Sequence, residues 1–126
     1  TQNPDGSIVH KVYDFYTFLY AYIKLFPKKD QYTLGIRLET LTIEIFELML
    51  LARAKTGMSK GLILHKIDLK IKLLKLLIRM SFDVKALSQS KYISLEEKLL
   101  EIGKMLGGWI KQHNTKEPQK NTELLS

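Results

Sequence analysis

Apolar residues recur every three or four positions along most of this chain, which is the period of an amphipathic helix. The pattern predicts a first helix that is capped by Asp5 or Ser7 and runs to Phe26. Pro27 should end it, because proline lacks a backbone donor and disfavours helix at the preceding residue. Residues 1–6 are polar and are predicted to be frayed. One face of this helix is expected to enter a core: Ile8, Val12, Phe15, Leu19, Ile23 and Phe26.

A second helix is predicted from Gln31 to Lys55, with Asp30 as its cap and Gly57 as the residue that ends it. Ser59 is then expected to cap the third helix. The second helix carries a regular apolar stripe, which consists of Leu34, Leu38, Leu41, Ile45, Leu48 and Ala52.

The third helical stretch, Leu62 to Leu87, is apolar around most of its circumference, far more than one buried face requires. Between positions 60 and 85 there are seven basic and two acidic residues, a net charge of 7 − 2 = +5 out of +7 for the chain. Two lysines opposite the main strip are expected to lay their stems on apolar surface and keep their ammonium groups in water. The strip consists of Lys72, Lys75 and Arg79, and the opposite pair of Lys66 and Lys70.

A fourth helix is predicted from Leu95 to about His113, behind the capping-box sequence Ser94-x-x-Glu97. Residues after Asn114 are predicted to form a disordered tail. The core seam of this helix repeats at intervals of four and three residues, through Leu95, Leu99, Ile102, Leu106 and Trp109.

Helices of about 20 residues joined by short loops predict an all-α fold, an up-down-up-down four-helix bundle that spans residues 7–113 as one domain. Two of the predicted helices carry more apolar surface than a single bundle would bury. The third is apolar nearly all round, and the first holds seven of the twelve aromatic residues between Tyr13 and Phe26. The outer rings of these aromatic residues could lie in grooves with their hydroxyl groups in water, pack against another subunit, or stack on nucleic-acid bases. Glycine inside a helix is costly, so a neighbouring element is expected to pack closely against Gly103, Gly107 and Gly108. Because a monomer would expose large apolar patches, we expect a homo-oligomer.

Composition narrows the function. The chain has no cysteine, which excludes disulfides, thiolate metal sites and cysteine nucleophiles, and agrees with a reducing, cytoplasmic setting. Charges interrupt every apolar run before 18 residues, so no membrane association is expected. A pI near 9.5 favours an acidic partner, of which nucleic acid is the commonest.

Motifs for catalysis are absent from the sequence, which has no phosphate-binding loop, zinc-protease motif or nucleophile elbow. His10, His65 and His113 fall on three different predicted helices without ligand spacing. Glu44 and Glu47 lack the Glu-x-x-His pair of carboxylate metal sites and are predicted to be solvated. We therefore expect no enzyme activity, no catalytic or metal-binding residues and no cofactor.

Five stretches together resemble the sequence pattern of one known family. The ending is the most specific of them, because it places glycine, glycine and tryptophan in a fixed order. The stretches are YDFY at 13–16, FPK at 26–28, YTLGIR at 32–37, LKLLIR at 74–79 followed by Asp83, and EIGKMLGGWIK at 101–111.

On these motifs the chain is similar, over about residues 8–113, to the accessory variability determinant (Avd) proteins of diversity-generating retroelements. The resemblance implies a homopentamer of four-helix bundles around a central channel, with a basic surface that binds RNA and DNA. It also implies association with the retroelement reverse transcriptase, which copies a template-repeat RNA with adenine-directed errors so that the cDNA diversifies a target gene.

The resemblance also carries candidate nucleic-acid-binding residues onto this sequence. Lys75 stands where the family has arginine, and a lysine cannot make the planar, bidentate contact of a guanidinium. The residues carried over are Arg37, Lys75, Arg79, Lys104 and Lys111, and charge alone adds Lys66, Lys70 and Lys72.

A second reading belongs to a different class. The intervening-sequence 23S rRNA proteins share the bundle but lack the T-L-G-x-R and G-G-W stretches. By analogy with them, the chain could be a structural oligomeric scaffold whose basic strip is only a solvated face.

Overall fold

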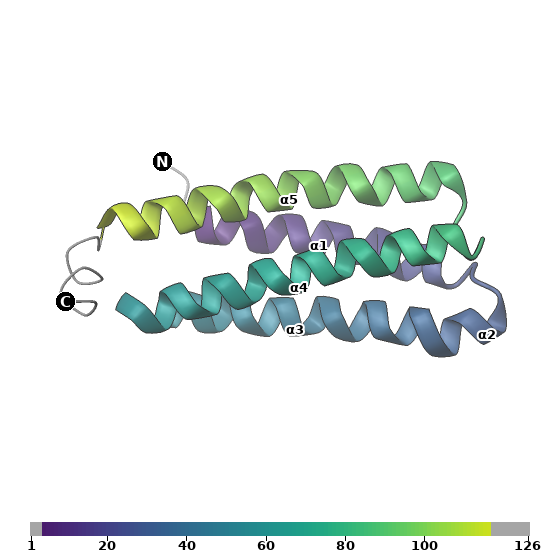
Figure 1. Cartoon of the computed structure of the whole chain (residues 1–126), viewed down its shortest axis with the longest axis horizontal. Helices are drawn as coiled ribbons and strands as arrows, with labels where there is room; N and C mark the ends of the chain where they lie inside the picture. Colours follow the sequence, from purple (N-terminus) through teal and green to yellow (C-terminus); the bar gives the residue numbers. More distant parts are fainter. Residues whose placement is uncertain (1–3, 117–126) are drawn as a thin grey trace.

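The computed structural model describes residues 4–116, with side chains from Ser7 onward. Within this range the chain forms four long helices that run alternately up and down (Figure 1), so the all-α bundle is confirmed. A three-residue helix, α2, and a π-helical turn, η1, lead into the second long helix. The elements are α1 (Pro4–Ile23), α2 (Lys28–Asp30), η1 (Gln31–Gly35), α3 (Ile36–Ala54), α4 (Gly57–Asp83) and α5 (Gln89–Lys116).

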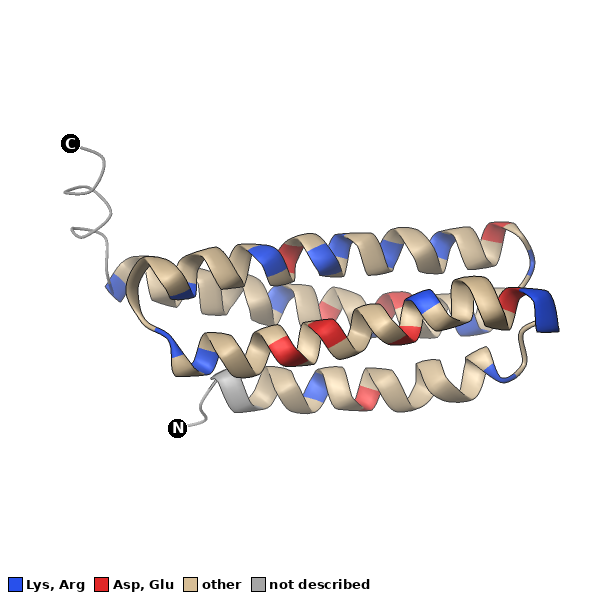
Figure 2. Cartoon of the chain, turned by 90° about the horizontal axis from the view of Figure 1, so that it is seen from below, with Lys and Arg blue, Asp and Glu red and all other residues tan. Residues whose placement is uncertain are grey.

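Each long helix packs mainly against two neighbours, in the cyclic order α1, α3, α4, α5 and back to α1 (Figures 1 and 2). The bundle therefore has four sides, each formed by two adjacent helices. The α1/α3 side and the α4/α5 side face in opposite directions. No helix in the described range is long and apolar enough to cross a membrane.

The core consists of the apolar seams that the sequence pattern indicates. All six positions predicted for the first helix and all five of the fourth are buried. On α3 the prediction was less accurate, because Met49 and Thr42 are buried while Leu34 and Leu48 are only partly so. The hydroxyl of Thr42 donates to the carbonyl of Leu38 at 2.8 Å, so this buried polar group is satisfied inside its own helix.

α1 begins at Pro4, so the predicted caps Asp5 and Ser7 lie inside it, and it ends at Ile23, before the predicted end at Phe26. The turn after α1 is closed by a side chain. The Nε2 amide of Gln31 donates to the carbonyls of Lys24 (3.1 Å) and Phe26 (3.0 Å), which the end of the helix would leave without partners. The predicted cap, Asp30, makes no side-chain capping bond, because helix already begins at Lys28 after Pro27.

The junction between α3 and α4 corrects two predictions. Gly57 does not end the second helix; α3 stops at Ala54, and Gly57 is the first residue of α4. Its φ of 62° lies in the left-handed region that glycine adopts without strain, so it turns the chain into the new helix. Ser59 consequently lies inside the first turn of α4, and Thr56 occupies the N-cap position.

The start of α5 corrects a third prediction. The helix begins at Gln89, not Leu95, so the predicted capping box lies within it. Ser94 has a tertiary role instead, because its Oγ accepts a hydrogen bond from the hydroxyl of Tyr22 on α1 at 3.4 Å. At the other end α5 continues through Lys116, past the predicted end at His113. The rest of the predicted tail, residues 117–126, lies outside the described residues, as do residues 1–3 of the predicted frayed start; residues 4–6 of that start belong to α1 instead.

Candidate nucleic-acid interface

Basic residues gather along α4 more than along any other helix in Figure 2. Eight Lys and Arg residues were predicted to bind nucleic acid, and α4 carries five of them. The structure divides the eight between two sides of the bundle. One group lies on α5 or on the part of α4 next to α5, and the other lies where α4 packs against α3.

Two basic residues of α4 are placed on the α4/α5 side by contacts with α5. The Nζ of Lys75 lies 3.9 Å from the point where a Cβ on Gly103 would be, so the glycine leaves room for the ammonium group. The guanidinium of Arg79 lies 5.9 Å from the ring centre of Tyr92. Lys72 lies one turn of helix before Lys75 and two turns before Arg79, and it is paired with Asp68 at 2.9 Å.

Arg79 is the most constrained of these residues. Its Nε donates to the Oδ1 of Asp83 at 3.0 Å, and its guanidinium lies 5.8 Å from the ring centre of Phe82. Phe82 and Tyr92 stack with their ring centres 4.6 Å apart. The hydrogen bond with the Tyr92 hydroxyl and the charge of Asp83 raise the pKa of Arg79 above its ordinary value. The guanidinium is thus held in place and stays charged.

Tyr92 is the functional neighbour that the sequence pattern did not indicate, because it precedes the predicted start of the fourth helix at Leu95. The turn before α5 brings it to Arg79: Lys85 adopts a positive φ of 67°, and the backbone amides of Ala86 and Leu87 donate to the carbonyl of Ser81. A Tyr one turn before the Leu95 seam, facing the end of a basic helix, would have been the available signal.

Two further predicted residues, Lys104 and Lys111, lie on the exposed outer surface of α5. They are seven residues apart and therefore lie along one line of the helix. Within the described part of the chain they make no ion pair. Together with the strip on α4 they make the α4/α5 side basic. We call these five residues the basic side: Lys72, Lys75, Arg79, Lys104 and Lys111.

The other three predicted residues lie toward α3 instead. The Nζ of Lys70 is 3.1 Å from the Oε1 of Glu44, so the snorkelling expected for this lysine is replaced by an ion pair. The same contact corrects the expectation that Glu44 is merely solvated. Arg37 is seven residues before Glu44 and lies on the same line of α3, and Lys66 is one turn before Lys70 on α4. The eight candidates therefore do not form one continuous patch.

Between these two basic groups, the outermost surface of α4 is apolar. Leucines seven residues apart run along it, with a methionine near each end, and all five side chains are exposed. No contact within the described part of the chain covers them. We call them the leucine ridge: Met58, Leu62, Leu69, Leu76 and Met80.

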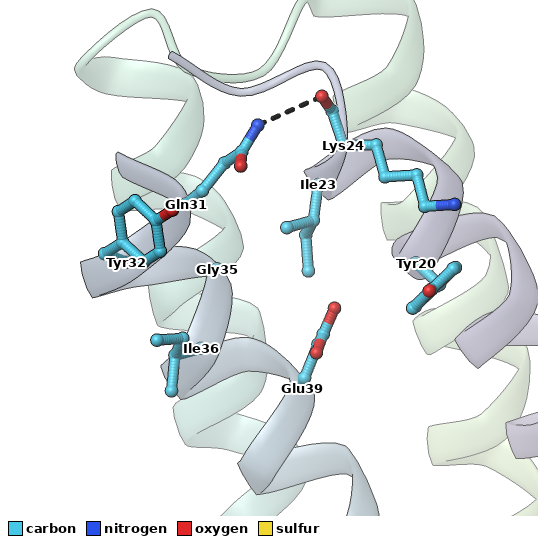
Figure 3. A pocket seen from close by; sticks show the side chains of 8 residues that line it. All are labelled: Tyr20, Ile23, Lys24, Gln31, Tyr32, Gly35, Ile36 and Glu39. Carbon is cyan, nitrogen blue, oxygen red and sulfur yellow. Dashed lines mark hydrogen bonds between the residues drawn. The ribbon is translucent and has the colours of Figure 1, made fainter. Parts of the chain in front are cut away.

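The α1/α3 side is different in character, because it is lined by aromatic and aliphatic side chains. A hollow of about 290 Å³ opens beside η1, with Tyr20 and Lys24 on one wall and Glu39 on the other (Figure 3). A second hollow of about 250 Å³ follows along α1, and Tyr20 lines both. We call the two hollows together the tyrosine groove. Its remaining lining residues are Tyr13, Tyr16, Thr17, Ile23, Gln31, Tyr32, Gly35 and Ile36.

Two titratable groups distinguish this groove from the α1/α5 side. Partial burial, and then the charge of Glu39, raise the pKa of the Tyr16 phenol, which therefore stays neutral. On the α1/α5 side Lys11 pairs with Glu101 at 2.7 Å, and hydrogen bonding to Glu101 raises the pKa of Lys11. Lys98 likewise donates to Asp14 at 3.4 Å, so the charges of that side are largely paired.

The three histidines lie on three different helices, α1, α4 and α5, as predicted. His65 and His113, from α4 and α5, line one hollow of about 170 Å³ with Asn114, a proximity that the sequence did not predict. His113 is buried and lies against Gly61. Among the described residues, His, Cys, Asp and Glu form no group of three or more that could hold a metal ion.

Comparison with known proteins agrees with the motif resemblance. The sequence model of a family described as bAvd-like matches residues 7–113, which is nearly the whole bundle. The suspected Avd resemblance is confirmed by this match. No curated protein matches the chain.

Proposed function

This chain belongs to the bAvd-like family, and from that membership we propose that it is a nucleic-acid-binding accessory subunit of a diversity-generating retroelement. In this role it binds the reverse transcriptase together with template RNA and cDNA during mutagenic retrohoming. It assembles as a homopentamer, as the family resemblance implies, and it acts by binding, without catalytic residues, metal or cofactor of its own. The setting proposed is the cytoplasm.

The observation that carries the proposal is the basic side. Phosphate groups of RNA and DNA are attracted by clustered Lys and Arg side chains, and this attraction supplies most sequence-independent affinity. Arg79 offers a planar guanidinium fixed by Asp83 and Tyr92, whereas Lys75 offers a point charge. We propose that these side chains follow the phosphate backbone, and we expect little preference for base sequence.

The partner protein poses an electrostatic problem. A reverse transcriptase holds a negatively charged template and primer, so its channel must be basic, and two basic surfaces repel each other. We propose that apolar contact or a bridging RNA overcomes this repulsion on one side of the ring. The basic side would then extend the electrostatic track for template RNA. Charge reversal at Arg37 or Arg79 should weaken template-primed cDNA synthesis.

Charge reversal on the basic side tests nucleic-acid binding. We expect Lys75→Glu with Arg79→Glu to reduce affinity for RNA or duplex DNA by at least about a hundredfold in fluorescence anisotropy, with the helical circular dichroism signal unchanged. The matched control is Lys28→Glu with Lys29→Glu on α2. Both pairs lower the formal charge by the same amount, from +7 to 7 − 4 = +3. If the two pairs weaken binding equally, only net charge matters and the basic side is not the interface.

Co-purification tests the partner. The protein and its reverse transcriptase should purify together, and treatment with nuclease separates direct contact from bridging by RNA. No complex under either condition, combined with unchanged nucleic-acid affinity in the charge-reversal pair, would leave the structural scaffold as the function.

A further inference from the structure

We propose that the leucine ridge of one copy packs into the tyrosine groove of the next copy, so that a single repeated contact builds the assembly. The inference rests on the proposed oligomer, but it adds which surfaces meet and in what manner. It uses only surfaces that are apolar and uncovered in the described chain. Of the basic side only Lys72 borders the contact, and the other four residues remain open to nucleic acid.

The ridge is a regular apolar stripe on the outermost line of α4. Leu62, Leu69 and Leu76 are 63%, 68% and 56% exposed, although leucine is among the residues most often buried. Their spacing of seven residues corresponds to about 10.5 Å along a helix. A repeat of this kind is typical of helices that pack knobs-into-holes against other helices.

The groove offers matching rows on two helices. On α3, Ile36 lines the groove, and Ile43 and Leu50 continue its line along the helix beyond the two hollows; all three are exposed and again seven residues apart. On α1, Tyr13 and Tyr20 are exposed with the same spacing. The two rows and the ridge therefore share a repeat of about 10.5 Å, which lets each leucine fall between side chains of the two rows.

The two rows of the groove are also in register with each other. Tyr20 and Ile36 line the same hollow (Figure 3). Because α1 and α3 are antiparallel, one heptad back from Tyr20 and one heptad on from Ile36 lead in the same direction along the bundle. Tyr13 and Ile43 consequently lie at a common level, one repeat away from the first pair. The rows thus form holes that a third helix can fill.

Charges at the margins favour this pairing over a contact between two ridges. Lys66 and Lys72 flank the ridge on its two sides, so two ridges would bring like charges together. On the receiving side, Glu39 lines the hollow, and Glu47 is exposed on α3 between Ile43 and Leu50. A ridge entering the groove therefore brings lysines toward carboxylates, with Lys24 as the one lysine that lines the hollow.

The geometry makes this a heterologous contact, in which two different surfaces meet. Such contacts generate a ring if the rotation closes and a filament if it does not. The ridge belongs to α4, which adjoins α3, so the ridge and the groove do not face in directly opposite directions. Each added copy therefore turns the assembly in the same sense, which is compatible with the closed ring of the proposed homopentamer.

Two variants and their mixture provide the main test. Leu69→Lys should disrupt the ridge, and Ile43→Lys should disrupt the α3 row that continues from the groove, so each variant should give about 14.6 kDa by light scattering. When the two are mixed, the intact ridge of one can enter the intact groove of the other. The mixture should therefore form dimers of about twice that mass and nothing larger. The control is Leu100→Lys, an equally exposed leucine on α5, which should leave the parent assembly intact.

Covalent trapping supplies a second test that does not depend on those variants. The chain has no native cysteine, so introduced thiols report a single contact. A double variant with Leu69→Cys and either Ile36→Cys or Ile43→Cys should give a disulfide ladder under oxidation that stops at the ring number. Single-cysteine variants should give at most dimers. If neither double variant forms more than its single-cysteine controls, the proposed packing is wrong.

The outcomes separate this inference from the function proposed above. A parent of 14.6 kDa at micromolar concentration would overturn both the packing and the oligomer. An oligomeric parent whose Leu69→Lys variant keeps its mass would overturn the packing alone. A mixture of the two variants that stays monomeric would also overturn it, because a heterologous contact must be restored.

Discussion

The α1/α3 side and the α4/α5 side are made of similar helices, yet they present opposite surfaces. On the α1/α3 side, tyrosines and isoleucines line a groove, in which Lys24 and Glu39 are the charged residues. On the α4/α5 side, lysines and an arginine cover the surface. On both sides, the core-facing residues of the helices repeat with the same period. The heptad repeat therefore sets the fold, and the residues on the outer positions decide what each side can bind.

Glycines sharpen the contrast, because they serve different purposes on the two sides. A Cβ on Gly35, beside the groove, would lie 2.8 Å from the Cγ2 of Ile23, which is closer than such atoms approach. A Cβ on Gly107, on α5, would meet nothing within 4 Å. The first glycine permits close packing inside the subunit. The second leaves open space on the outside, so within this chain the neighbour predicted for it is not found.

The largest expected difference between the sides is the response of nucleic-acid binding to salt. If all five residues of the basic side contact phosphates, binding to duplex DNA should weaken by about 10²–10³-fold between 50 and 200 mM salt. Lys104→Gln should lower the slope of log affinity against log salt by about 0.9. Anisotropy titrations at several salt concentrations measure both.

The α1/α3 side supplies the comparison for that experiment. Tyr20→Ser should leave the slope unchanged, because the groove contributes no phosphate contact. A slope that falls as much for Tyr20→Ser as for Lys104→Gln would mean that nucleic acid lies across both sides. A lower affinity with an unchanged slope would instead support stacking of bases on the tyrosines.

Gly35→Ala should produce the next largest effect, this time on stability. Forcing a methyl group against the buried Ile23 costs about 1–3 kcal/mol, and alanine regains about 1 kcal/mol of helix propensity. We expect a net loss of about 1 kcal/mol or slightly more in chemical denaturation. A variant as stable as the parent would show that α1 and α3 can separate at this point without cost.

Gly107→Ala should have a smaller effect of the opposite sign. With open space around the new methyl group, the gain in helix propensity is at most about 1 kcal/mol, or roughly 4 °C in the melting midpoint. Thermal melting of a monomeric background such as Leu69→Lys measures this without interference from assembly. Destabilisation there would contradict the open surface described for this glycine.

Parts of this structure could be predicted and others could not, for physical reasons. The seam from Leu95 to Trp109 was correct because its period alone determines which face is buried. The prediction that Gly57 ends a helix was wrong because a positive φ can occur at the start of a helix as well as at its end. The prediction that Ser94 caps the fourth helix was wrong because a capping sequence also occurs inside helices. There the role of the serine depends on tertiary partners such as Tyr22.

The candidate site was predictable only as a set of charges. The sequence identifies Arg79 as basic, but its contacts with Tyr92 depend on a turn whose geometry the pattern does not specify. The division of the eight residues between two sides also depends on which helices are neighbours. The ion pair between Lys70 and Glu44 shows this, because it joins α4 to α3 across 26 residues of sequence.

The smallest predicted effect contrasts two raised pKa values. Hydrogen bonding to Tyr92, with the charge of Asp83, raises the pKa of Arg79 and so preserves a charge on the basic side, whereas burial and Glu39 raise that of Tyr16 and so avoid a charge in the groove. Above the ordinary tyrosine pKa near 10, the unfolded chain loses the Tyr16 proton while the folded chain still holds it. Stability should therefore fall slightly as pH rises from about 10 through the raised pKa of Tyr16. Below that range the contribution is fully present.

Tyr16→Phe removes this titration and keeps the ring. The variant should lose less stability than the parent between about pH 9 and 11 and behave like it at pH 7, in urea denaturation at each pH. Tyr32→Phe is the control, because the Tyr32 ring is largely exposed and the substitution should leave the parent's alkaline loss unchanged. The effect is small because Tyr16 is only partly shielded from water. If the parent and Tyr16→Phe lose stability equally over this range, the groove does not discriminate against charge at Tyr16, and its contrast with the basic side rests on composition alone.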